Sequence, residues 1–555
     1  MPERTVRQAI ADATAACAAE GICEAVPVEA VSLERPPRPE MGDFAANTAM
    51  ILAKAAKMKP RELAEAIVAR LELPEGFAER VEIAGPGFIN FHLSNQWLYD
   101  ALTTTLAQGV SYGRSTIGAG KRANVEFVSA NPVGPIHIGN ARGGPVGDVI
   151  ANLLQAIGYE VEREYYINDA SDNTQLNKFG ASVRARYLQA LGRDAELPED
   201  GYHGDYVADY GRLLAERHGD EYADADEPDV LFADLVLDDV VEGMRRDCSD
   251  LEIEFDTWFS ERELRQRGAV QQVLDQLAKR EETYERDGAT WLRTTAHGDD
   301  QDHVLVRRTG APTYLATDVA YHANKYDRGH DLLIDIWGPD HHGRIVPMRA
   351  AVACLGYEDR DFELIMHQTV RLVRGGKVAP MSKRGGTMVS LRDIIDAVGG
   401  DVARYLLLTR STDAHIDFDL EVAKRQSEEN PVYYVQYAHT RMCGIFRTAE
   451  QANVATDDVA SADFSLLQHD DELALLRAIA DFPGYVQTAA VARAPHRLTT
   501  FAQSLAQQFH QLYTSCRVVT DDDALTQARL ALVRGTQIAM RNTLNLLGVS
   551  APEHM

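Results

Sequence analysis

The sequence lacks most of the signals that mark secreted, membrane-bound or zinc-stapled proteins. Its six cysteines are scattered over 555 residues without a CxxC pair, so they predict neither a disulfide framework nor a structural zinc site. No run of about 18 apolar residues occurs, the length that a membrane-spanning helix requires. The first residues lack the apolar core of a signal peptide. We therefore expect a cytoplasmic protein without a membrane partner.

Positive charge is also scarce. The chain has 56 lysines and arginines against 84 aspartates and glutamates, a formal net charge of −28. A protein that coats nucleic acid non-specifically would be basic, so this class is excluded, although local basic patches on an acidic body can still bind RNA. The apolar fraction of 45% is sufficient for packed cores, and the length predicts about two to four domains.

Residues 125–140 carry the most specific pattern of the chain. The alternating run Val125–Val128 predicts a strand that ends before Asn131 and Pro132. A turn follows, then the tetrad His137-Ile138-Gly139-Asn140, then an apolar stripe at helical spacing that is closed by Gly158. The tetrad therefore lies where a strand is followed by a helix, and free backbone N–H groups at such a place can bind phosphate.

This tetrad resembles the HIGH motif of class I aminoacyl-tRNA synthetases, with Asn140 in place of the second histidine. The segment Pro380–Gly386 resembles the KMSK loop of the same class, with Pro380 in place of the first lysine. Each motif alone has a structural explanation, a histidine in a turn or an exposed basic loop. Together and in this order they imply catalysis by His137, Asn140 and Lys383. The residues expected around ATP are Pro135, His137, Gly139, Asn140, His341, Met381, Ser382 and Lys383.

Residues 1–115 are expected to form a separate α+β domain. Gly42-Asp43-Phe44 and Ala84–Phe91 resemble the N-terminal domain of arginyl-tRNA synthetases, which contacts the elbow of the tRNA. The resemblance places Asn90 near this contact. A domain that only packs on its neighbour would explain the same pattern.

Residues 116–390 are expected to form a Rossmann-type α/β catalytic domain, with a mostly helical insertion at about 175–290. Glu126 lies near the end of the first strand, where open α/β sheets bind ligands. A carboxylate is costly to bury there without a cation, and a guanidinium substrate would supply one. The alternative is an edge-strand glutamate that points into water. In arginyl-tRNA synthetases the glutamate and asparagine of this run, here Glu126 and Asn131, contact the amino acid.

Tyr314 and Asp318 are one helical turn apart and can share a face. A phenol and a carboxylate could together hold a guanidinium, and similar residues line the arginine pocket of the family. A packed tyrosine beside a helix-start aspartate would also fit. The triplet Asp340-His341-His342 follows a buried strand and resembles a family motif of the substrate cleft, in which Asp340 is expected to contact arginine. Metallophosphoesterases use such a triplet for metals, but the other aspartate motifs they need are missing.

The remaining chain is expected to be helical, with a bridge over 391–430 and an all-α anticodon-binding domain over 431–555. Tyr434, Tyr437 and Arg441 lie on one helical face, which offers rings for base stacking and a guanidinium for phosphate, although such a face more often packs in a core. Residues 430–441 and the ending Leu546–Met555 resemble the tRNA-binding surface of arginyl-tRNA synthetases, so Met555 joins this set.

The resemblance implies a bacterial-type arginine–tRNA ligase. It would form arginyl-adenylate from L-arginine and ATP with Mg²⁺, then transfer arginine to tRNA(Arg), and it would need tRNA for activation. A monomer is expected, with no zinc, no tightly bound organic cofactor and no editing site. Three alternatives stay open: a class I synthetase for glutamine or cysteine, a small nucleotidylyltransferase, and a non-catalytic tRNA-binding paralogue.

Overall fold

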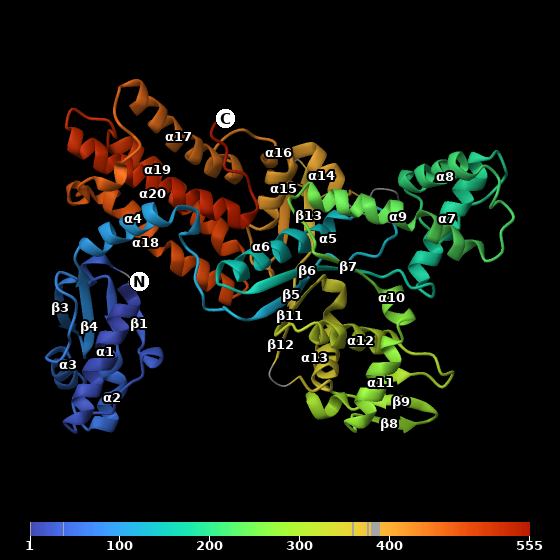
Figure 1. Cartoon of the computed structure of the whole chain (residues 1–555), viewed down its shortest axis with the longest axis horizontal. Coiled ribbons are helices and arrows are strands. Elements are labelled where there is room, and N and C mark those ends of the chain that lie inside the picture. Colours follow the sequence, from blue (N-terminus) through green and yellow to red (C-terminus); the bar gives the residue numbers. More distant parts are fainter. Residues whose placement is uncertain (1, 37, 358–359, 375–376, 379–388) are drawn as a thin grey trace. The chain divides into compact units, whose positions relative to one another are not determined.

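The computed structural model describes residues 2–36, 38–357, 360–374, 377–378 and 389–555 (Figure 1). The chain divides into two compact units. One unit comprises Met1–Tyr112, Met442–Phe482 and Gln507–Ala539. The other comprises Gly113–Arg441, Pro483–Ala506 and Met540–Met555. Among the described residues, no helix is both long and apolar enough to cross a lipid bilayer.

An antiparallel sheet and three helices form the N-terminal part of the first unit. The strands follow the order β1-β2-β4-β3: β1 (Leu33–Glu34), β2 (Phe44–Ala46), β4 (Phe88–Leu93) and β3 (Ala78–Ala84). The helices that share their core are α1 (Pro2–Ala19), α2 (Thr48–Ala56) and α3 (Pro60–Val68). Helix α4 (Gln96–Gln108) follows the sheet. The predicted α+β character is confirmed.

A parallel sheet is the centre of the second unit. Its strands are β5 (Arg122–Glu126), β6 (Glu160–Ile167), β7 (Thr257–Ser260), β11 (Leu332–Trp337) and β12 (Asp361–Met366). They follow the order β12-β11-β5-β6-β7, and every neighbouring pair is parallel. Helices α5 (Ile138–Ala141) and α6 (Gly143–Ala156) connect β5 to β6. This arrangement confirms the predicted Rossmann-type fold.

The predicted insertion is helical but ends earlier than expected. Helices α7 (Thr174–Ala190), α8 (Asp205–His218) and α9 (Pro228–Ser249) fill it. The chain then returns to the parallel sheet, because Thr257–Ser260 pairs with β6 as the edge strand β7. A four-residue strand is too short to show a clear alternation in the sequence, so the mostly helical insertion expected at about 175–290 included this strand.

A second, smaller sheet follows β7. It is antiparallel and contains β8 (Thr283–Arg286), β9 (Ala289–Leu292) and β10 (His303–Val306). The helices of this region are α10 (Glu261–Gln266), α11 (Ala269–Lys279), α12 (Tyr314–Asp327) and α13 (Ile345–Ala353). Apolar residues of α11, α12 and α13 share one core with β11 and β12, so α12 is fixed beside the central sheet.

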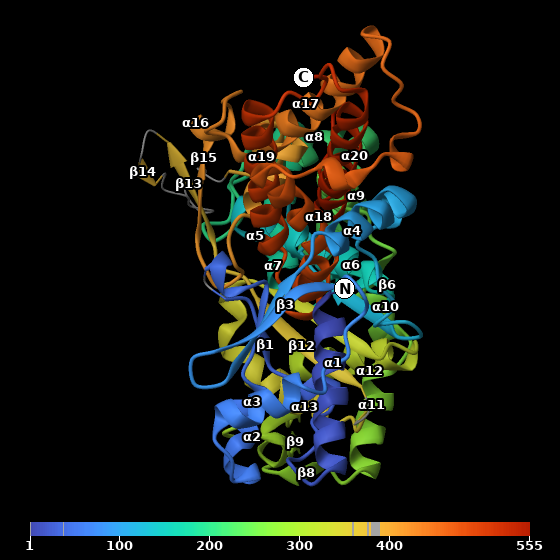
Figure 2. The same cartoon turned by 90° about the vertical axis from the view of Figure 1, so that its left-hand side faces the viewer.

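The expected helical bridge contains a strand. Helices α14 (Leu391–Val398), α15 (Gly400–Leu407) and α16 (Leu420–Ala423) are present, but Ile416–Asp419 is strand β15. It pairs in parallel with β13 (Val370–Arg374), which also pairs with β14 (Lys377–Val378), and Figure 2 shows this sheet beside α16. Buried Ile416 and Phe418 flank exposed Asp417, a period-2 pattern that the helical prediction overlooked.

The chain ends in four long helices, as predicted. They are α17 (Pro431–Gln451), α18 (Asp470–Val491), α19 (His496–Ser515) and α20 (Asp523–Leu547). Burial follows the apolar stripe on α19, whose buried members are Leu498, Phe501, Leu505, Phe509 and Leu512. The stripe is therefore a packing face.

Helix α6 begins at Gly143, with Pro145 in its first turn, where a missing backbone donor costs nothing. Its glycines allow close packing against the strand end. A Cβ at Gly147 would lie 2.1 Å from the Phe127 ring, and one at Gly144 would lie 3.0 Å from Ile253. The Gly143-Gly144-Pro145 run thus starts the helix and does not kink it.

The guanidinium of Arg142, between α5 and α6, is fully buried and binds backbone carbonyls of distant segments. Its Nη1 donates to the carbonyl of Ala414 at 2.7 Å, and its Nη2 donates to those of Ser411 at 2.7 Å and Arg410 at 2.9 Å. Burial lowers the pKa of Arg142 to about 10, so it stays charged at neutral pH. The residue therefore ties the helix that carries the tetrad to the segment before β15.

Replacing Arg142 by methionine should destabilise the second unit by about 3 kcal/mol or more, because several buried carbonyl groups lose their donor. Differential scanning calorimetry should show a Tm that is lower by about 4 °C or more. The Arg142→Lys variant, which keeps the charge but not the planar fork, should recover only part of the loss. An unchanged Tm in the methionine variant would show that these carbonyls do not depend on Arg142.

Candidate active site

The candidate site lies at the carboxyl ends of β5 and β11, two neighbouring strands in the middle of the parallel sheet. From β5 the chain continues through β6 and β7 on one side, and later through β11 and β12 on the other. The direction of winding therefore reverses between β5 and β11. Open α/β sheets bind ligands at such a switch point, and the segments that follow these two strands carry most of the predicted site residues.

The turn after β5 is locked in a strained conformation. Val128 and Ser129 have φ angles of 69° and 38°, in the left-handed region that a β-branched residue rarely adopts. The Ser129 Oγ donates to Glu126 at 2.9 Å and accepts from the backbone N–H of Tyr166 at 3.1 Å. These bonds fix the exit of the chain from the sheet.

His137 caps helix α5 with its own ring. Its Nδ1 accepts the backbone N–H of Gly139 at 2.9 Å, so the neutral imidazole carries its proton on Nε2. A Cβ at Gly139 would lie 2.9 Å from the same Nδ1. Glycine is therefore needed at this position to seat the histidine ring, whether or not Gly139 also lies beside ATP as expected.

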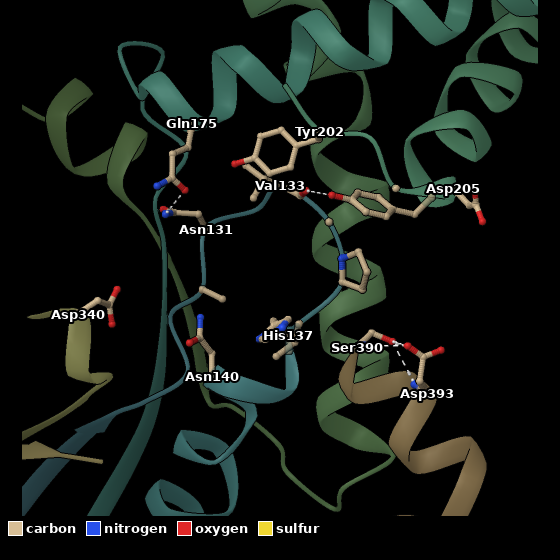
Figure 3. A pocket seen from close by; sticks show the side chains of 16 residues that line it. Asn131, Val133, His137, Asn140, Gln175, Tyr202, Asp205, Asp340, Ser390 and Asp393 are labelled. Carbon is tan, nitrogen blue, oxygen red and sulfur yellow. Dashed lines mark hydrogen bonds between the residues drawn. The ribbon is translucent and has the colours of Figure 1, made fainter. Parts of the chain in front are cut away.

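A cavity of about 380 Å³ opens in front of this ring (Figure 3). We call it the His137 cavity. It is lined by Ala130, Asn131, Val133, Gly134, Pro135, Ile136, His137, Asn140, Gln175, Tyr202, Gly204, Asp205, Tyr206, Asp340, Ser390 and Asp393. Of the residues predicted to bind ATP, Pro135, His137 and Asn140 lie on it.

The insertion contributes one wall of the His137 cavity, which the sequence did not predict. The Tyr206 hydroxyl donates to the carbonyl of Val133 at 3.2 Å, and its ring lies so close to Gly134 that a Cβ there would approach it to 2.3 Å. The Asn131 amide donates to Gln175 at 2.9 Å (Figure 3). The dense run of tyrosine and glycine over residues 201–206 was the available signal.

The segment that follows the predicted Met-Ser-Lys loop pairs with the tetrad. The backbone N–H of Ile138 donates to the carbonyl of Val389 at 3.2 Å, and that of Leu391 donates to Ile136 at 2.7 Å. Ser390 then caps helix α14 together with Asp393. Met381, Ser382 and Lys383 themselves lie outside the described residues, so their predicted roles stay predictions.

A second cavity, of about 180 Å³, lies beside the first and shares Asn131 with it. We call it the Asp318 cavity. It is lined by Glu126, Val128, Ser129, Asn131, Tyr166, Asn168, Asp318, Tyr321, His322, Asp335, Ile336, Trp337, Gly338, His341, Arg344 and Met348. Three of these side chains are carboxylates, so the cavity suits a cationic group.

Lys325 of helix α12 neutralises the floor of the Asp318 cavity. Its ammonium group is fully buried and lies 2.6 Å from Glu126 and 2.8 Å from Asp335. Burial raises the pKa of Glu126, whereas the charges of Lys325 and His322 overcome burial at Asp335 and lower its pKa well below the usual range. The cation that makes burial of Glu126 possible is thus supplied by the protein. From the sequence we expected a guanidinium substrate to supply this cation. Because Lys325 supplies it, the burial of Glu126 is no evidence for such a substrate.

Asp318 is partly exposed and faces the cavity from the second turn of α12. Burial raises its pKa even though Arg344 lies beside it. Arg344 forms an ion pair with this carboxylate. Tyr314, one turn earlier, is 49% exposed and does not line the cavity, so the expected clamp of Tyr314 and Asp318 is not formed in this structure.

Asp340 and His341 line different cavities, although they are neighbours in the sequence. Asp340 lies on the His137 cavity, and His341 lies on the Asp318 cavity. The reason is that Pro339–Arg344 forms a 3₁₀ helix, in which successive side chains point about 120° apart. A sequence read as a simple strand end cannot show this.

The predicted tRNA contacts differ in exposure. Asn90 lies on strand β4 and is 2% exposed, so its side chain is not available to RNA, contrary to the prediction. Ile89, Phe91 and Leu93 of β4 belong to the core, so alternation places Asn90 on the other face of the sheet, where it is buried as well. Tyr437 is 37% exposed, and the guanidinium carbon of Arg441 lies 5.5 Å from the centre of its ring. The rings of Tyr433 and Tyr437 are stacked with their centres 6.0 Å apart, and Tyr434 follows Tyr433 in the helix. Met555 is 55% exposed.

Within the described part of the chain, one group of potential metal ligands converges: Glu282, His297 and Cys354. Its geometry has another explanation, since His297 Nε2 bonds both oxygens of Glu282 at 3.1 Å. Burial raises the pKa of the Cys354 thiol to about 12, which keeps it protonated. The Asp340-His341-His342 triplet is not such a group, and the metallophosphoesterase interpretation fails with it.

A further group of charges supports strand β6 next to the site. Glu162 lies 2.7 Å from Arg328 and 2.6 Å from His330, and it accepts a hydrogen bond from Thr257 at 2.6 Å. Burial opposes ionisation, but these partners lower the pKa of Glu162 to about 2. The ionised form of Glu162 is therefore favoured more strongly in the folded protein than in the unfolded chain, so its ionisation stabilises the fold.

Three family models match the chain. One described as the N-terminal domain of arginyl-tRNA synthetase matches residues 4–93. One described as the catalytic domain of class I tRNA synthetases (R) matches 101–197 and 217–426, and the DALR anticodon-binding domain matches 435–555.

Curated and solved proteins match along the whole length. The arginine–tRNA ligase of Moorella thermoacetica is 48% identical over 559 residues, with 100% of this chain and 99% of that protein covered. That of Heliobacterium modesticaldum is 46% identical over 535 residues, covering 95% and 94%. The structure of Thermus thermophilus arginyl-tRNA synthetase matches with a TM-score of 0.76 at 23% identity and full coverage of both chains, which shows a shared fold.

In the Glu162→Gln variant the free energy of unfolding should fall less than in the wild type as the solution is acidified. Because the folded pKa is about 2 against an ordinary 4.5, the stabilisation is complete above about pH 4.5 and is lost as the pH falls toward 2. Between pH 6 and pH 3.5 the wild type should lose about 1.4 kcal/mol more than the variant. Urea unfolding at both pH values measures this, with Glu160→Gln on the same strand as the control. Equal losses in wild type and Glu162→Gln would contradict the assignment.

Proposed function

The chain belongs to the arginyl-tRNA synthetase family, and from this premise we propose how its residues divide the work of the reaction. The enzyme activates L-arginine with ATP, which gives arginyl-adenylate and pyrophosphate. It then transfers the arginyl group to the 3′-terminal ribose of tRNA(Arg) and releases AMP. A synthetase for glutamine or cysteine, a nucleotidylyltransferase and a non-catalytic paralogue are no longer needed as alternatives.

One observation carries the assignment of substrates: two cavities meet at Asn131, and they differ in chemistry. We place ATP in the His137 cavity, which is next to the start of helix α5, and arginine in the acidic Asp318 cavity. The carboxylate of arginine and the α-phosphate of ATP would then meet near Asn131. Holding the two reactants side by side supplies much of the catalysis.

On the ATP side we propose that His137 donates from Nε2 to a phosphate oxygen, since its Nδ1 is engaged by the Gly139 N–H. The charge that develops as pyrophosphate leaves is then stabilised by fixed donors. Asn140 offers an amide donor from the first turn of α5. Lys383 is proposed to contribute the positive charge of the loop, and Mg²⁺ enters with ATP.

On the arginine side we propose that Asp318 binds the guanidinium, because it is the carboxylate of this cavity that Lys325 does not neutralise. Glu126 and Asn131 would bind the α-ammonium end, close to the His137 cavity. Asp340, on that cavity, is proposed to face ATP, and His341 to border arginine.

For tRNA(Arg) we propose the aromatic face of α17. Tyr437 offers an exposed ring in a stack with Tyr433, and Arg441 lies over it. Stacked rings and a guanidinium suit unpaired bases and their phosphates. Tyr434 and the exposed Met555 are proposed as further contacts.

The test of this function is ATP–pyrophosphate exchange with each of the twenty amino acids, with and without tRNA(Arg). Exchange should occur with arginine and should require tRNA. Exchange with another amino acid, or none with arginine when tRNA is present, would contradict the proposal. Exchange with arginine in the absence of tRNA would remove only the tRNA requirement.

The Asp318→Asn variant should raise the KM for arginine by about 100-fold, because a neutral amide replaces the charged partner of the guanidinium. The KM for ATP should change less than about threefold, since ATP lies in the other cavity. Aminoacylation kinetics measure both. Asp327→Asn, near the end of the same helix, is the matched control. Equal changes in the two KM values would show that Asp318 does not act on arginine specifically.

A further inference from the structure

The Asp318 cavity already contains a guanidinium of the protein itself. Arg344 is the last residue of the 3₁₀ helix after β11, and its side chain lines the cavity. It forms an ion pair with Asp318, and its guanidinium carbon lies 5.9 Å from the centre of the Trp337 ring. A carboxylate on one side and an aromatic face on the other are the partners that an arginine substrate would also seek.

The charges of the cavity explain why Arg344 lies there. Lys325 bridges Glu126 and Asp335, and His322 bonds the second oxygen of Asp335. Asp318 is thus the carboxylate that depends on a cation from outside this buried group. When arginine is absent, Arg344 is the cation on Asp318.

Arg344 is also placed so that it can leave. Its side chain is 47% exposed and that of Asp318 is 24% exposed. Because both groups are already partly hydrated, breaking this ion pair costs little free energy. Removing the fully buried Lys325 would cost much more, because it would leave buried carboxylates without a partner. The two cations of the cavity differ in this respect: one is fixed and one is exchangeable.

We propose that Arg344 is a placeholder for the substrate: it occupies the guanidinium position on Asp318 until arginine displaces it. This inference rests on the proposed function, since it assumes that arginine binds in this cavity. Binding then exchanges one guanidinium for another, and the charge around Asp318 stays constant. The cavity is competent only in the fraction of molecules in which Arg344 has withdrawn, so the apparent affinity for arginine is lowered by that fraction.

The test uses the Arg344→Met variant of the full chain and isothermal titration calorimetry with L-arginine, without tRNA. Removal of the competing guanidinium should tighten arginine binding about two- to fivefold, the range expected for a partly exposed ion pair. Arg349→Met is the matched control, because Arg349 is exposed on the following helix and does not line the cavity. It should bind arginine as the wild type does.

A double-mutant cycle separates displacement from other effects of the substitution. In an Asp318→Asn background the Arg344→Met change should no longer tighten binding, because the ion pair is already lost. Unchanged or weaker binding in the Arg344→Met single variant would overturn the proposal, the latter by showing that Arg344 is itself a ligand of arginine. The failure of the proposed function looks different: the wild type would then neither bind arginine nor charge tRNA(Arg).

Discussion

The bridge from Lys325 to Glu126 and Asp335 is the interaction on which the active site depends. It joins helix α12 to the ends of β5 and β11, the two strands between which the winding of the sheet reverses. Breaking a buried ion pair on one side costs several kcal/mol, because the remaining charge is left without compensation. The bridge therefore fixes the floor of the Asp318 cavity and leaves Asp318 as the carboxylate that Lys325 does not neutralise.

Arg142 is a second buried cation that joins distant segments near the site, but its partners are uncharged backbone carbonyls. Its guanidinium holds the carbonyls of Arg410, Ser411 and Ala414, so the short helix that carries the tetrad is tied to the chain before β15. A buried cation therefore stabilises the elements around each cavity: Lys325 of α12 for the Asp318 cavity, and Arg142 at the junction of α5 and α6 for the His137 cavity. The strained turn at Val128 and Ser129 lines the Asp318 cavity.

The sequence allowed the sheet, the tetrad and Asp318 to be predicted, because each depends on local order: alternation, a glycine turn, and one turn of helix. It did not reveal the partner of Glu126, since Lys325 is 199 residues away and its pairing exists only in the folded sheet. The placement of Asp340 and the burial of Asn90 were missed for a related reason. A 3₁₀ turn decides where Asp340 points, and packing over the face of β4 opposite the core buries Asn90; neither is visible in residue type alone.

The return of the chain from α9 to β7 has a consequence for how this enzyme can change over time. Because β6 and β7 are parallel, the chain leaves the sheet at the carboxyl end of β6, at Ile167, and re-enters it at the amino end of β7, where Thr257 pairs with Glu164. Closure entropy grows slowly with loop length, so this crossover can be lengthened, shortened or exchanged at little cost as long as it still spans the offset between these two points. The wall of the His137 cavity that carries Tyr206 can therefore vary in length and sequence while the strands of the sheet keep their order.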